Sequence, residues 1–311
     1  ACRRNYVDRS VAIKDIKRYV SDNAGAAISD LFHGMDPVID YSKARVAVVG
    51  GGPTGMAAAY FIGRAGIPVT LYEKTDRLGG IVRHVIPAFR ISDGAIDKDE
   101  ALMRKMGVEV KLSTPAPSAA ELKAMGYTHI FYAVGAGKAG ALNIPGNVVP
   151  VIAWLRDMKA GKDVSLGHVA VVGGGNTAMD AARAALRSGA KSSTLVYRRT
   201  KKYMPADAEE LELAMADGVE FLELVAPVEQ KDGKLICEKM KLGDPDAQGR
   251  RKPVPTGEQV SIDCDTVVAA VGEQVDGAFF TENGIQVDAK GIPDFMTNLS
   301  GVYVGGDAMR G

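Results

Sequence analysis

Short apolar runs that lead into glycine are the main pattern of this chain. Residues 46–49 and 169–172 both read VAVV. Such a continuous apolar run is typical of a parallel strand that is buried on both faces. Each run is followed by three glycines and then by an alanine-rich stretch with helical spacing of its apolar residues. The pattern predicts a strand, a glycine turn and a helix, twice, and therefore an α/β fold.

The two stretches are copies of one unit. Residues 45–59 (RVAVVGGGPTGMAAA) and 168–182 (HVAVVGGGNTAMDAA) are identical at 11 of 15 positions and lie 123 residues apart. This period is longer than the ~20–50 residues of solenoid repeats. A glycine turn that opens a helix is typical of a dinucleotide site, because the helix N-terminus attracts phosphate. We therefore expect two Rossmann-like dinucleotide-binding domains, the second inserted in the first.

In the first copy each glycine has its own physical role. Gly50 makes the tight turn, Gly52 lets the backbone approach a pyrophosphate, and Gly55 lets the helix pack close to the strand. A second strand, expected at residues 67–72, ends at Glu73, which is 23 residues after Gly50. An acid at this point holds ribose hydroxyls and repels a 2′-phosphate. The first copy therefore indicates a site for FAD or NAD.

The second copy differs from the first in two ways. Gly173 and Gly175 repeat the first two roles, but Ala178 replaces the third glycine. The next predicted strand leads into Arg198 and Arg199 instead of an acid. Guanidinium groups bind phosphate through parallel charge-assisted hydrogen bonds, which favours NADP(H). The alternative is that the two arginines are an ordinary solvated pair.

The remaining pattern predicts further elements around these two units. Residues 231–234 (KDGK) are typical of a hairpin turn, and a small antiparallel insertion is expected on the second unit. Residues 244–258 are polar and contain three prolines and two glycines, which predicts a loop. A helix is expected at residues 10–22, and strands at 108–112, 128–137, 193–197, 219–225, 234–242, 259–262, 265–272 and 301–304.

Composition and charge exclude several classes of protein. The chain is 46% hydrophobic and 24% charged, as is usual for globular proteins. Lys+Arg and Asp+Glu are both 38, so we expect neither a nucleic acid nor a membrane surface as partner. No apolar run approaches the ~18 residues of a membrane span. Residues 1–5 lack the apolar core of a signal peptide, and we expect a cytoplasmic location.

Cysteine and histidine usage excludes further chemistry. The three cysteines, Cys2, Cys237 and Cys264, form no CxxC pair, so neither a disulfide scaffold nor a dithiol of sequence neighbours is expected. The four histidines are scattered without metal-ligand spacing, and no metal site is expected. No side chain stands out as an acid or base, so we name no catalytic residue.

A set of motifs in a fixed order identifies a family. GGGPTG, LGGIVRHVIPAFRI, FYAVGAG, GGGNTAMDAARAA, VYRRTKKYMPA, KLGDPDAQGRRKPVP, AAVGEQ and GGDAMRG follow one another along the chain. Together they resemble the FAD- and NADPH-binding small (beta) subunit of bacterial glutamate synthase and its relatives. Those relatives include the N-terminal half of dihydropyrimidine dehydrogenase and selenate-reductase-type subunits. The resemblance covers essentially the whole chain.

The resemblance implies a set of FAD-binding residues. The glycine loop and Glu73 would hold the ADP half, and Asp307 the ribityl chain or pyrophosphate. The implied FAD residues are Gly50, Gly52, Pro53, Thr54, Gly55, Glu73, Gly80, Ile81, Val110, Gly135, Gly306 and Asp307.

The resemblance also implies an NADPH site. The second glycine loop would face the pyrophosphate, the two arginines the 2′-phosphate, and Glu210, or else Glu209, a ribose. The implied NADPH residues are Gly173, Gly175, Asn176, Thr177, Ala178, Arg198, Arg199 and Glu210.

The domain organisation and the partners follow from the same resemblance. Residues 41–145 and 275–311 would form the FAD-binding domain and residues 146–274 the NADPH-binding domain. Residues 1–40 would be a helical leader at the end of an iron–sulfur domain, with Cys2 at the place of its last cluster ligand. The family continues past the GGD motif in a helix, so we expect this chain to be a segment of a longer polypeptide.

The expected activity is that of an NADPH-oxidising flavin module. Hydride would pass from NADPH to FAD, and electrons would pass onward to an iron–sulfur domain or subunit, with the clusters only in the missing regions. One alternative is a subunit of the selenate-reductase or dihydropyrimidine-dehydrogenase type. A second is a thioredoxin-reductase-like flavoenzyme, which needs a dithiol. Another is a module that binds FAD as a scaffold without turnover.

Overall fold

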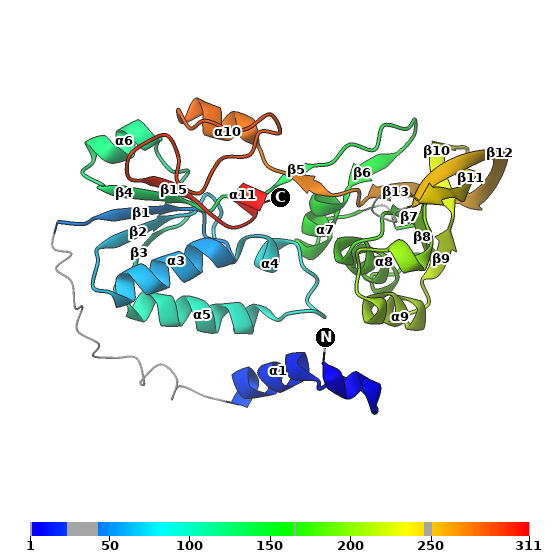
Figure 1. Ribbon diagram of the computed structural model, residues 1–311, viewed down its shortest axis with the longest axis horizontal. Coiled ribbons are helices and arrows are strands. Elements are labelled where there is room, and N and C mark those ends of the chain that lie inside the picture. Colours follow the sequence, from blue (N-terminus) through cyan, green and yellow to red (C-terminus); the bar gives the residue numbers. More distant parts are fainter. Residues whose placement is uncertain (1, 24–42, 165, 246–250, 311) are drawn as a thin grey trace.

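The computed structural model describes residues 2–23, 43–164, 166–245 and 251–310. Two separate five-stranded sheets, each purely parallel, dominate it, and the predicted α/β fold class is confirmed (Figure 1). The first sheet has the order β15-β4-β1-β2-β3. Its strands are β1 (Val46–Val49), β2 (Val69–Tyr72), β3 (Glu109–Lys111), β4 (His129–Tyr132) and β15 (Val302–Val304).

Both faces of the first sheet are covered, which explains the unbroken apolar run of β1. Val46 and Val48 face one core, and Ala47 and Val49 face the other. Figure 1 shows α3 and α5 on one side of this sheet and α6 and α10 on the other. The helices are α3 (Pro53–Arg64), α4 (Gly80–His84), α5 (Asp93–Lys105), α6 (Ala119–Ala124), α10 (Gly277–Glu282) and α11 (Asp307–Arg310).

The second sheet has the order β6-β13-β7-β8-β9, with helices on one face. A three-stranded antiparallel sheet, β10-β11-β12, packs on its other face through Cys237, Leu235 and Val225. The parallel strands are β6 (Val148–Pro150), β7 (His168–Val172), β8 (Ser192–Tyr197), β9 (Glu220–Glu223) and β13 (Thr266–Ala269). The other elements are α7 (Val151–Lys159), α8 (Asn176–Arg187), η2 (Lys201–Tyr203), α9 (Ala208–Ala216), β10 (Val225–Lys231), β11 (Lys234–Pro245) and β12 (Arg251–Asp263).

The chain crosses between the two sheets twice. It leaves the first sheet after β4 through β5 (Lys138–Ala139) and returns through β14 (Glu273–Gln274), and these two strands pair antiparallel. The strand β15 then pairs with β4. The second sheet is therefore inserted in the first, as predicted. We call the first sheet with its helices the first unit, and the second sheet with its helices and the antiparallel sheet the second unit.

The predicted loop at residues 244–258 is wrong at residues 244–245 and 251–258, which lie in β11 and β12, whereas its residues 246–250 lie outside the described residues. The strand β12 begins at Arg251, and its Pro253 and Pro255 pair with Leu242 and Met240 of β11. Proline is tolerated in an edge strand where its nitrogen faces away from the neighbour, and β12 is such an edge. Positions 253 and 255 are two apart and face the same way. The prolines therefore mark an outer strand, and not a loop.

The predicted hairpin and the predicted N-terminal helix are both present. Asp232 and Gly233 have φ values of 52° and 71°, which a tight two-residue hairpin turn requires. The helix α1 (Ile13–Asn23) follows the short η1 (Arg3–Tyr6). No residue of α1 is buried. Residues 24–40 of the expected leader lie outside the described residues. In the part of the chain that the structure describes, no helix is long and apolar enough to span a bilayer.

Candidate functional site

The first glycine loop has the geometry of a phosphate cradle. Gly50 has φ +104°, and a Cβ there would lie 2.5 Å from the carbonyl oxygen of Ala133. A Cβ on Gly55 would lie 1.8 Å from the carbonyl oxygen of Gly50, so the helix can approach the strand only through glycine. At Gly52 the nearest atom would be 3.9 Å away, and this N-cap of α3 has no side-chain cap. The loop therefore packs tightly at Gly50 and Gly55, whereas at Gly52 it is open enough for a dinucleotide pyrophosphate to approach the backbone.

Glu73 lies directly beneath this loop. One carboxylate oxygen accepts a hydrogen bond from the Gly51 N–H at 2.7 Å, and the other accepts from the Thr75 N–H and hydroxyl at 2.8 Å. The side chain is buried. Since both oxygens have protein partners, a ribose hydroxyl would share them. Glu73 therefore braces the loop in addition to the predicted ribose contact.

Three segments far apart in the sequence meet at the first loop. Gly80 opens α4, and a Cβ there would lie 2.9 Å from the Cα of Gly52. A Cβ on Gly306, after β15, would lie 2.3 Å from the hydroxyl of Thr54. These glycines lie at the carboxyl ends of the parallel strands, where open α/β sheets bind their ligands.

The other implied FAD residues lie around this point. Asp307 is exposed and begins α11. Gly135 has a positive φ with open space around it. Ile81 packs, partly buried, against the helical core of the second unit. Val110 lies farther away on β3 and packs into the core beneath α3.

The second glycine loop repeats the first with one change in packing. A Cβ on Gly173 would lie 2.2 Å from the carbonyl oxygen of Ala270, and no atom lies within 4 Å at Gly175. Gly175 is the N-cap of α8 and has no side-chain cap. Ala178, in place of the third glycine, is completely buried. Asn176 accepts a hydrogen bond from the Asp207 N–H at 3.3 Å, which ties the loop to the start of α9.

Tyr197 takes the place of Glu73 in the second unit, a match that the sequence pattern does not predict. Val49 pairs with Tyr72, and Val172 pairs with Val196, so the residue after the pair is Glu73 in one unit and Tyr197 in the other. A Cβ on the middle glycine, Gly174, would lie 2.5 Å from the Tyr197 ring. The register of the two strands identifies the match, whereas the sequence pattern favours the arginines at this place.

The two arginines lie just beyond Tyr197 and are free of carboxylates. Arg198 is exposed and Arg199 is half-buried. Among the described residues, no carboxylate oxygen forms an ion pair with either guanidinium, and the buried Nε of Arg199 lacks a hydrogen-bond partner. Burial raises the pKa of Tyr197, and both arginines oppose that shift. The end of β8 therefore offers unpaired positive charge, which fits a phosphate group.

The two candidate ribose acids have different environments. Glu210 is buried on α9 and is paired with Arg90 of the first unit, which lowers the pKa of the Glu210 carboxyl. Glu209 is exposed and pairs with Lys14 of α1 at 3.1 Å. The structure thus pairs Glu210 with the first unit and Glu209 with the N-terminal helix.

The cysteines lie away from both loops. Cys237 and Cys264 are completely buried in the core between the antiparallel sheet and the second parallel sheet. Burial raises the pKa of Cys237 to about 12 and that of Cys264 to about 11. Both are therefore protonated thiols at neutral pH, and thiolate chemistry is disfavoured there.

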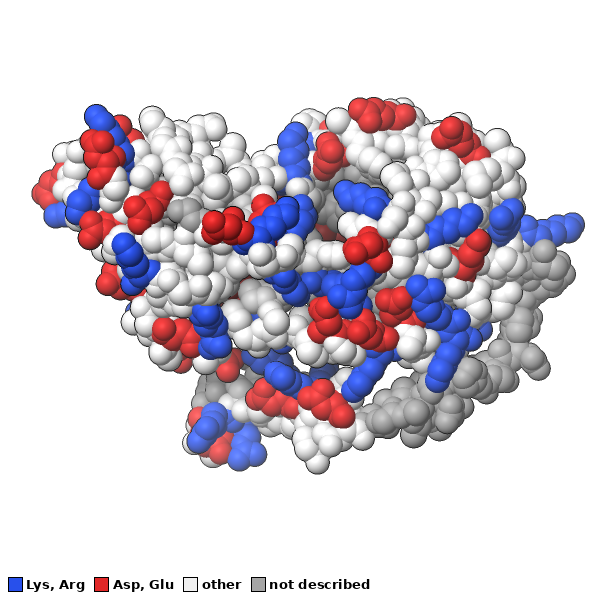
Figure 2. All heavy atoms as spheres, turned by 180° about the vertical axis from the view of Figure 1, so that it is seen from behind, with Lys and Arg blue, Asp and Glu red and all other residues white. Residues whose placement is uncertain are grey.

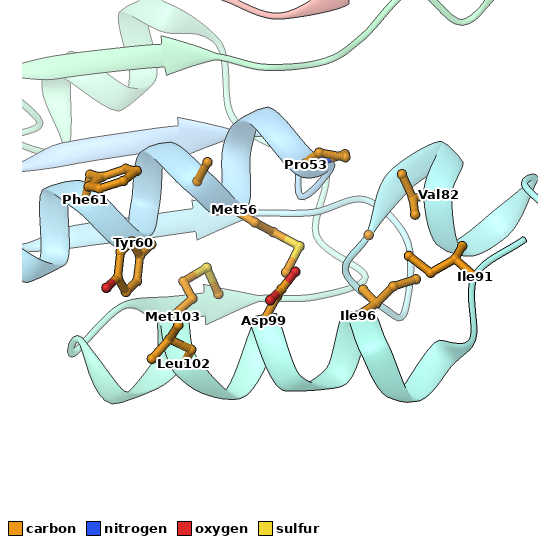
Figure 3. A pocket seen from close by; sticks show the side chains of 12 residues that line it. Pro53, Met56, Tyr60, Phe61, Val82, Ile91, Ile96, Asp99, Leu102 and Met103 are labelled. Atoms are coloured by element: carbon orange, nitrogen blue, oxygen red, sulfur yellow. The ribbon is translucent and has the colours of Figure 1, made fainter. Parts of the chain in front are cut away.

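A pocket between α3 and α5 is separate from the polar chemistry of the loops. Its volume is about 270 Å³, and its lining is mostly apolar, with Asp99 and Tyr60 as its polar side chains (Figure 3). Met56 of α3 and Met103 of α5 point into it. Asp99 supplies a negative charge, which would repel the phosphates of a dinucleotide.

The molecular surface carries both signs of charge. Figure 2 shows acidic and basic side chains interspersed over the face opposite to that of Figure 1. With 38 basic and 38 acidic residues, the chain has no net charge to attract a polyanion over long distances.

Two linked parallel sheets, each with a glycine loop at the carboxyl end of its central strand, are the architecture of proteins that bind two dinucleotides. The sequence profile described as "Pyridine nucleotide-disulphide oxidoreductase" matches residues 44–311. The chain belongs to this family, whose cofactors are a flavin and a nicotinamide dinucleotide.

Individual relatives agree with this membership. The chain is 39% identical over 321 residues to the oxidoreductase YgfK of Escherichia coli (strain K12), matching 100% of this chain and 31% of that protein. It is 30% identical over 347 residues to the glutamate synthase [NADPH] small chain of Halomonas elongata, matching 100% of this chain and 72% of that protein. The predicted resemblance to the glutamate synthase small chain is confirmed. The chain spans less than a third of the length of YgfK.

A solved structure supports the fold. FprA from Mycobacterium tuberculosis (the His57Gln mutant) superposes with a TM-score of 0.67 at 21% identity, covering 86% of this chain and 79% of that one. At this identity the likeness shows the shared fold of two Rossmann-like domains.

Proposed function

We propose that the chain is an NADPH-oxidising flavin module of the glutamate synthase small-subunit type. The observation that carries this proposal is the contrast between the two strand ends. A buried carboxylate, Glu73, lies beneath the first loop, whereas Tyr197 and two unpaired arginines lie at the second. The first arrangement suits FAD, and the second suits a nucleotide with a 2′-phosphate.

The proposed FAD site lies in residues 41–145 and 275–311, and the proposed NADPH site in residues 146–274. When bound, the two cofactors supply hydride transfer from NADPH to FAD and onward release of electrons to iron–sulfur centres. The chain's own residues bind and orient them. The proposed FAD residues are Gly50, Gly52, Pro53, Thr54, Gly55, Glu73, Gly80, Ile81, Val110, Gly135, Gly306 and Asp307, and the proposed NADPH residues are Gly173, Gly175, Asn176, Thr177, Ala178, Arg198, Arg199 and Glu210.

The proposed electron acceptor is an iron–sulfur domain or subunit outside this chain. The length of YgfK beyond the matched region leaves room for such a domain in that relative. The position of Cys2 is the feature of this chain that supports the proposal. No cluster is proposed within the chain, because Cys2 alone does not hold one and the other two cysteines are buried in the core of the second unit.

The test is the visible spectrum of the purified chain reconstituted with FAD. We expect a yellow protein whose flavin absorption bleaches on anaerobic addition of NADPH, and much more slowly with NADH. A yellow protein that neither nucleotide bleaches would favour the scaffold alternative. A preparation that retains no flavin would contradict the proposed first site.

A further inference from the structure

Residues 85–90 of the first unit lie on the helical face of the second unit. Val85 is buried in the core that α7, α8 and α9 form, and Phe89 packs against the same core. The Lys159 ammonium on α7 donates a hydrogen bond to the carbonyl oxygen of Ile86 at 2.6 Å. The connection between α4 and α5 is thus docked on the second unit.

Arg90, at the end of this segment, contacts two carboxylates of the second unit. Its Nε donates a hydrogen bond to Asp180 Oδ1 at 2.5 Å, and its Nη2 is paired with Glu210 Oε2. The side chains of Arg90, Asp180 and Glu210 are 22%, 14% and 12% exposed. Because little water surrounds them, these ion pairs are screened less than pairs on the surface.

Both acids are close to the second glycine loop. Asp180 lies on α8, one turn after the helix begins at Asn176. The start of α9, which carries Glu210, is tied to the loop by a hydrogen bond from the Ala206 N–H to the carbonyl oxygen of Gly174 at 3.0 Å. Arg90 therefore reaches from the first unit to the edge of the nucleotide site of the second.

Arg90 is the main cationic partner of these acids. Among the described residues, the other cation within 4.0 Å is Arg183, whose Nη1 is 4.0 Å from Glu210 Oε2. The Nε of Arg183 donates a hydrogen bond to Asp217 Oδ2 at 2.8 Å. Burial raises the pKa of Asp180, whereas the hydrogen bond from Arg90 lowers the pKa of Glu210.

Only one oxygen of Glu210 is used by the arginines. Arg90 and Arg183 both contact Oε2. In the part of the chain that the structure describes, no donor is hydrogen-bonded to Oε1. The ion pair with Arg90 therefore holds the carboxylate by Oε2 and leaves Oε1 available to another donor.

We propose that Arg90 is a positioning residue of the second nucleotide site. It holds Glu210 through Oε2 so that Oε1 can accept a hydrogen bond from a ribose hydroxyl of the bound dinucleotide. The proposal rests on the proposed function, because it takes the second loop to bind NADP(H). It also means that a side chain of the first unit completes the nucleotide site of the second.

The test measures NADP⁺ affinity by calorimetry on the FAD-loaded chain, without turnover. Arg90→Gln should release Glu210 and so weaken the charge-assisted hydrogen bond between the ribose and Oε1. We therefore expect this variant to bind NADP⁺ at least ~10-fold more weakly. Arg90→Lys keeps the charge but cannot span both carboxylates with a planar fork, so we expect an intermediate affinity. The matched control is Arg104→Gln, which removes an arginine that pairs with Glu100 within α5 and should leave the affinity unchanged.

A double-mutant cycle separates positioning from a general loss of structure. If Arg90 acts through Glu210, adding Arg90→Gln to Glu210→Gln should weaken NADP⁺ binding by less than ~2-fold further. Full additivity of the two losses would contradict the positioning role. If Arg90→Gln does not fold, the cycle is run with Arg90→Lys.

The outcomes distinguish the two proposals. If the wild-type chain and the folded Arg90→Gln variant bind NADP⁺ with equal affinity, this inference alone is overturned. Wild-type chain that binds no NADP⁺ would overturn the proposed function, and this inference with it.

Discussion

Glu73 and Tyr197 occupy the same place at the ends of β2 and β8, each in contact with the middle glycine of its loop. The first loop therefore has a fixed negative charge beneath it, and the second has a neutral ring. A phosphate monoester carries nearly two negative charges at neutral pH, so the neutral ring removes a repulsion that Glu73 would impose. Arg198 and Arg199 then supply the attraction.

Glu73 stabilises the first loop even without a ligand. Glu73→Ala leaves the Gly51 and Thr75 N–H groups without their acceptor, which should lower the free energy of unfolding by about 1–3 kcal/mol. Glu73→Gln keeps one acceptor oxygen and should cost less. Urea unfolding of the flavin-free variants measures both. An alanine variant as stable as the wild type would show that the brace is dispensable.

Arg198 should set the preference for the 2′-phosphate. A charge-assisted hydrogen bond contributes about 1.5–3 kcal/mol, so Arg198→Glu should reduce the NADPH/NADH preference by at least ~10-fold. Steady-state flavin reduction with each nucleotide measures this ratio. Lys202→Glu, a charge reversal at an exposed position nearby, should change the ratio little. Equal effects of the two reversals would indicate a general field and no specific contact.

At the scale of elements, strands with a strong local pattern were predictable, and strands set by their neighbours were not. The apolar run 46–49 predicted the bounds of β1, because a short apolar run that ends at a glycine turn is typical of a buried parallel strand. The end of β12 was predicted as the strand at 259–262, but its first part was missed because Pro253 and Pro255 favour a loop locally, while pairing with β11 over many residues outweighs that preference. The position of Tyr197 depended on a register between β7 and β8 that no local pattern encodes.

The helices α8 and α9 are joined by one carboxylate. Asp217, the C-cap of α9, accepts hydrogen bonds from Arg183 at 2.8 Å and Arg187 at 2.9 Å. The hydrogen bond from Arg187 is the main cause that lowers the pKa of Asp217 from 3.8 to about 2. The arginines also offset an unfavourable negative charge at the C-terminus of a helix.

This pair should make the stability of the chain depend on pH. Because the pKa of Asp217 is lower in the folded state, its contribution is present above pH ~4 and is lost as the pH falls towards ~2. The urea midpoint of Asp217→Asn should therefore lie below that of the wild type at pH 6, and the gap should shrink between pH ~4 and ~2. Glu212→Gln, at an exposed position of the same helix, should follow the wild type. A gap that stays constant with pH would contradict the ion-pair argument.

At the scale of the whole molecule, the two glycine loops were predictable because each copy of the strand–loop–helix pattern lies within about 30 consecutive residues. The contact between Arg90 and Glu210 was not, because it joins residues far apart in sequence across the two units. The motif that contains Arg90 was visible in the sequence, but nothing local indicated which acid it would meet. The packing of the two units against each other determines which acid Arg90 contacts.

The family name includes disulphide chemistry, and the two buried cysteines allow a direct check. Cys237→Ala with Cys264→Ala should leave NADPH-driven flavin reduction within ~2-fold of the wild type, because cavities of this size affect stability more than a distant site. Anaerobic reduction of the double variant by NADPH measures this. A folded double variant that no longer reduces its flavin would restore the dithiol alternative.

The return of the chain to β15 also orders events during synthesis on the ribosome. About 170 residues separate Tyr132, where β4 ends, from Val302, where β15 begins, so at ~5–20 residues per second β4 waits roughly 10–30 s for its neighbour. Throughout that interval the open edge of β4 can pair with other nascent chains. The second unit, by contrast, emerges as one continuous segment and can fold before the first unit closes. Slow translation near residues 270–300 would therefore prolong the period in which the chain is most prone to aggregate.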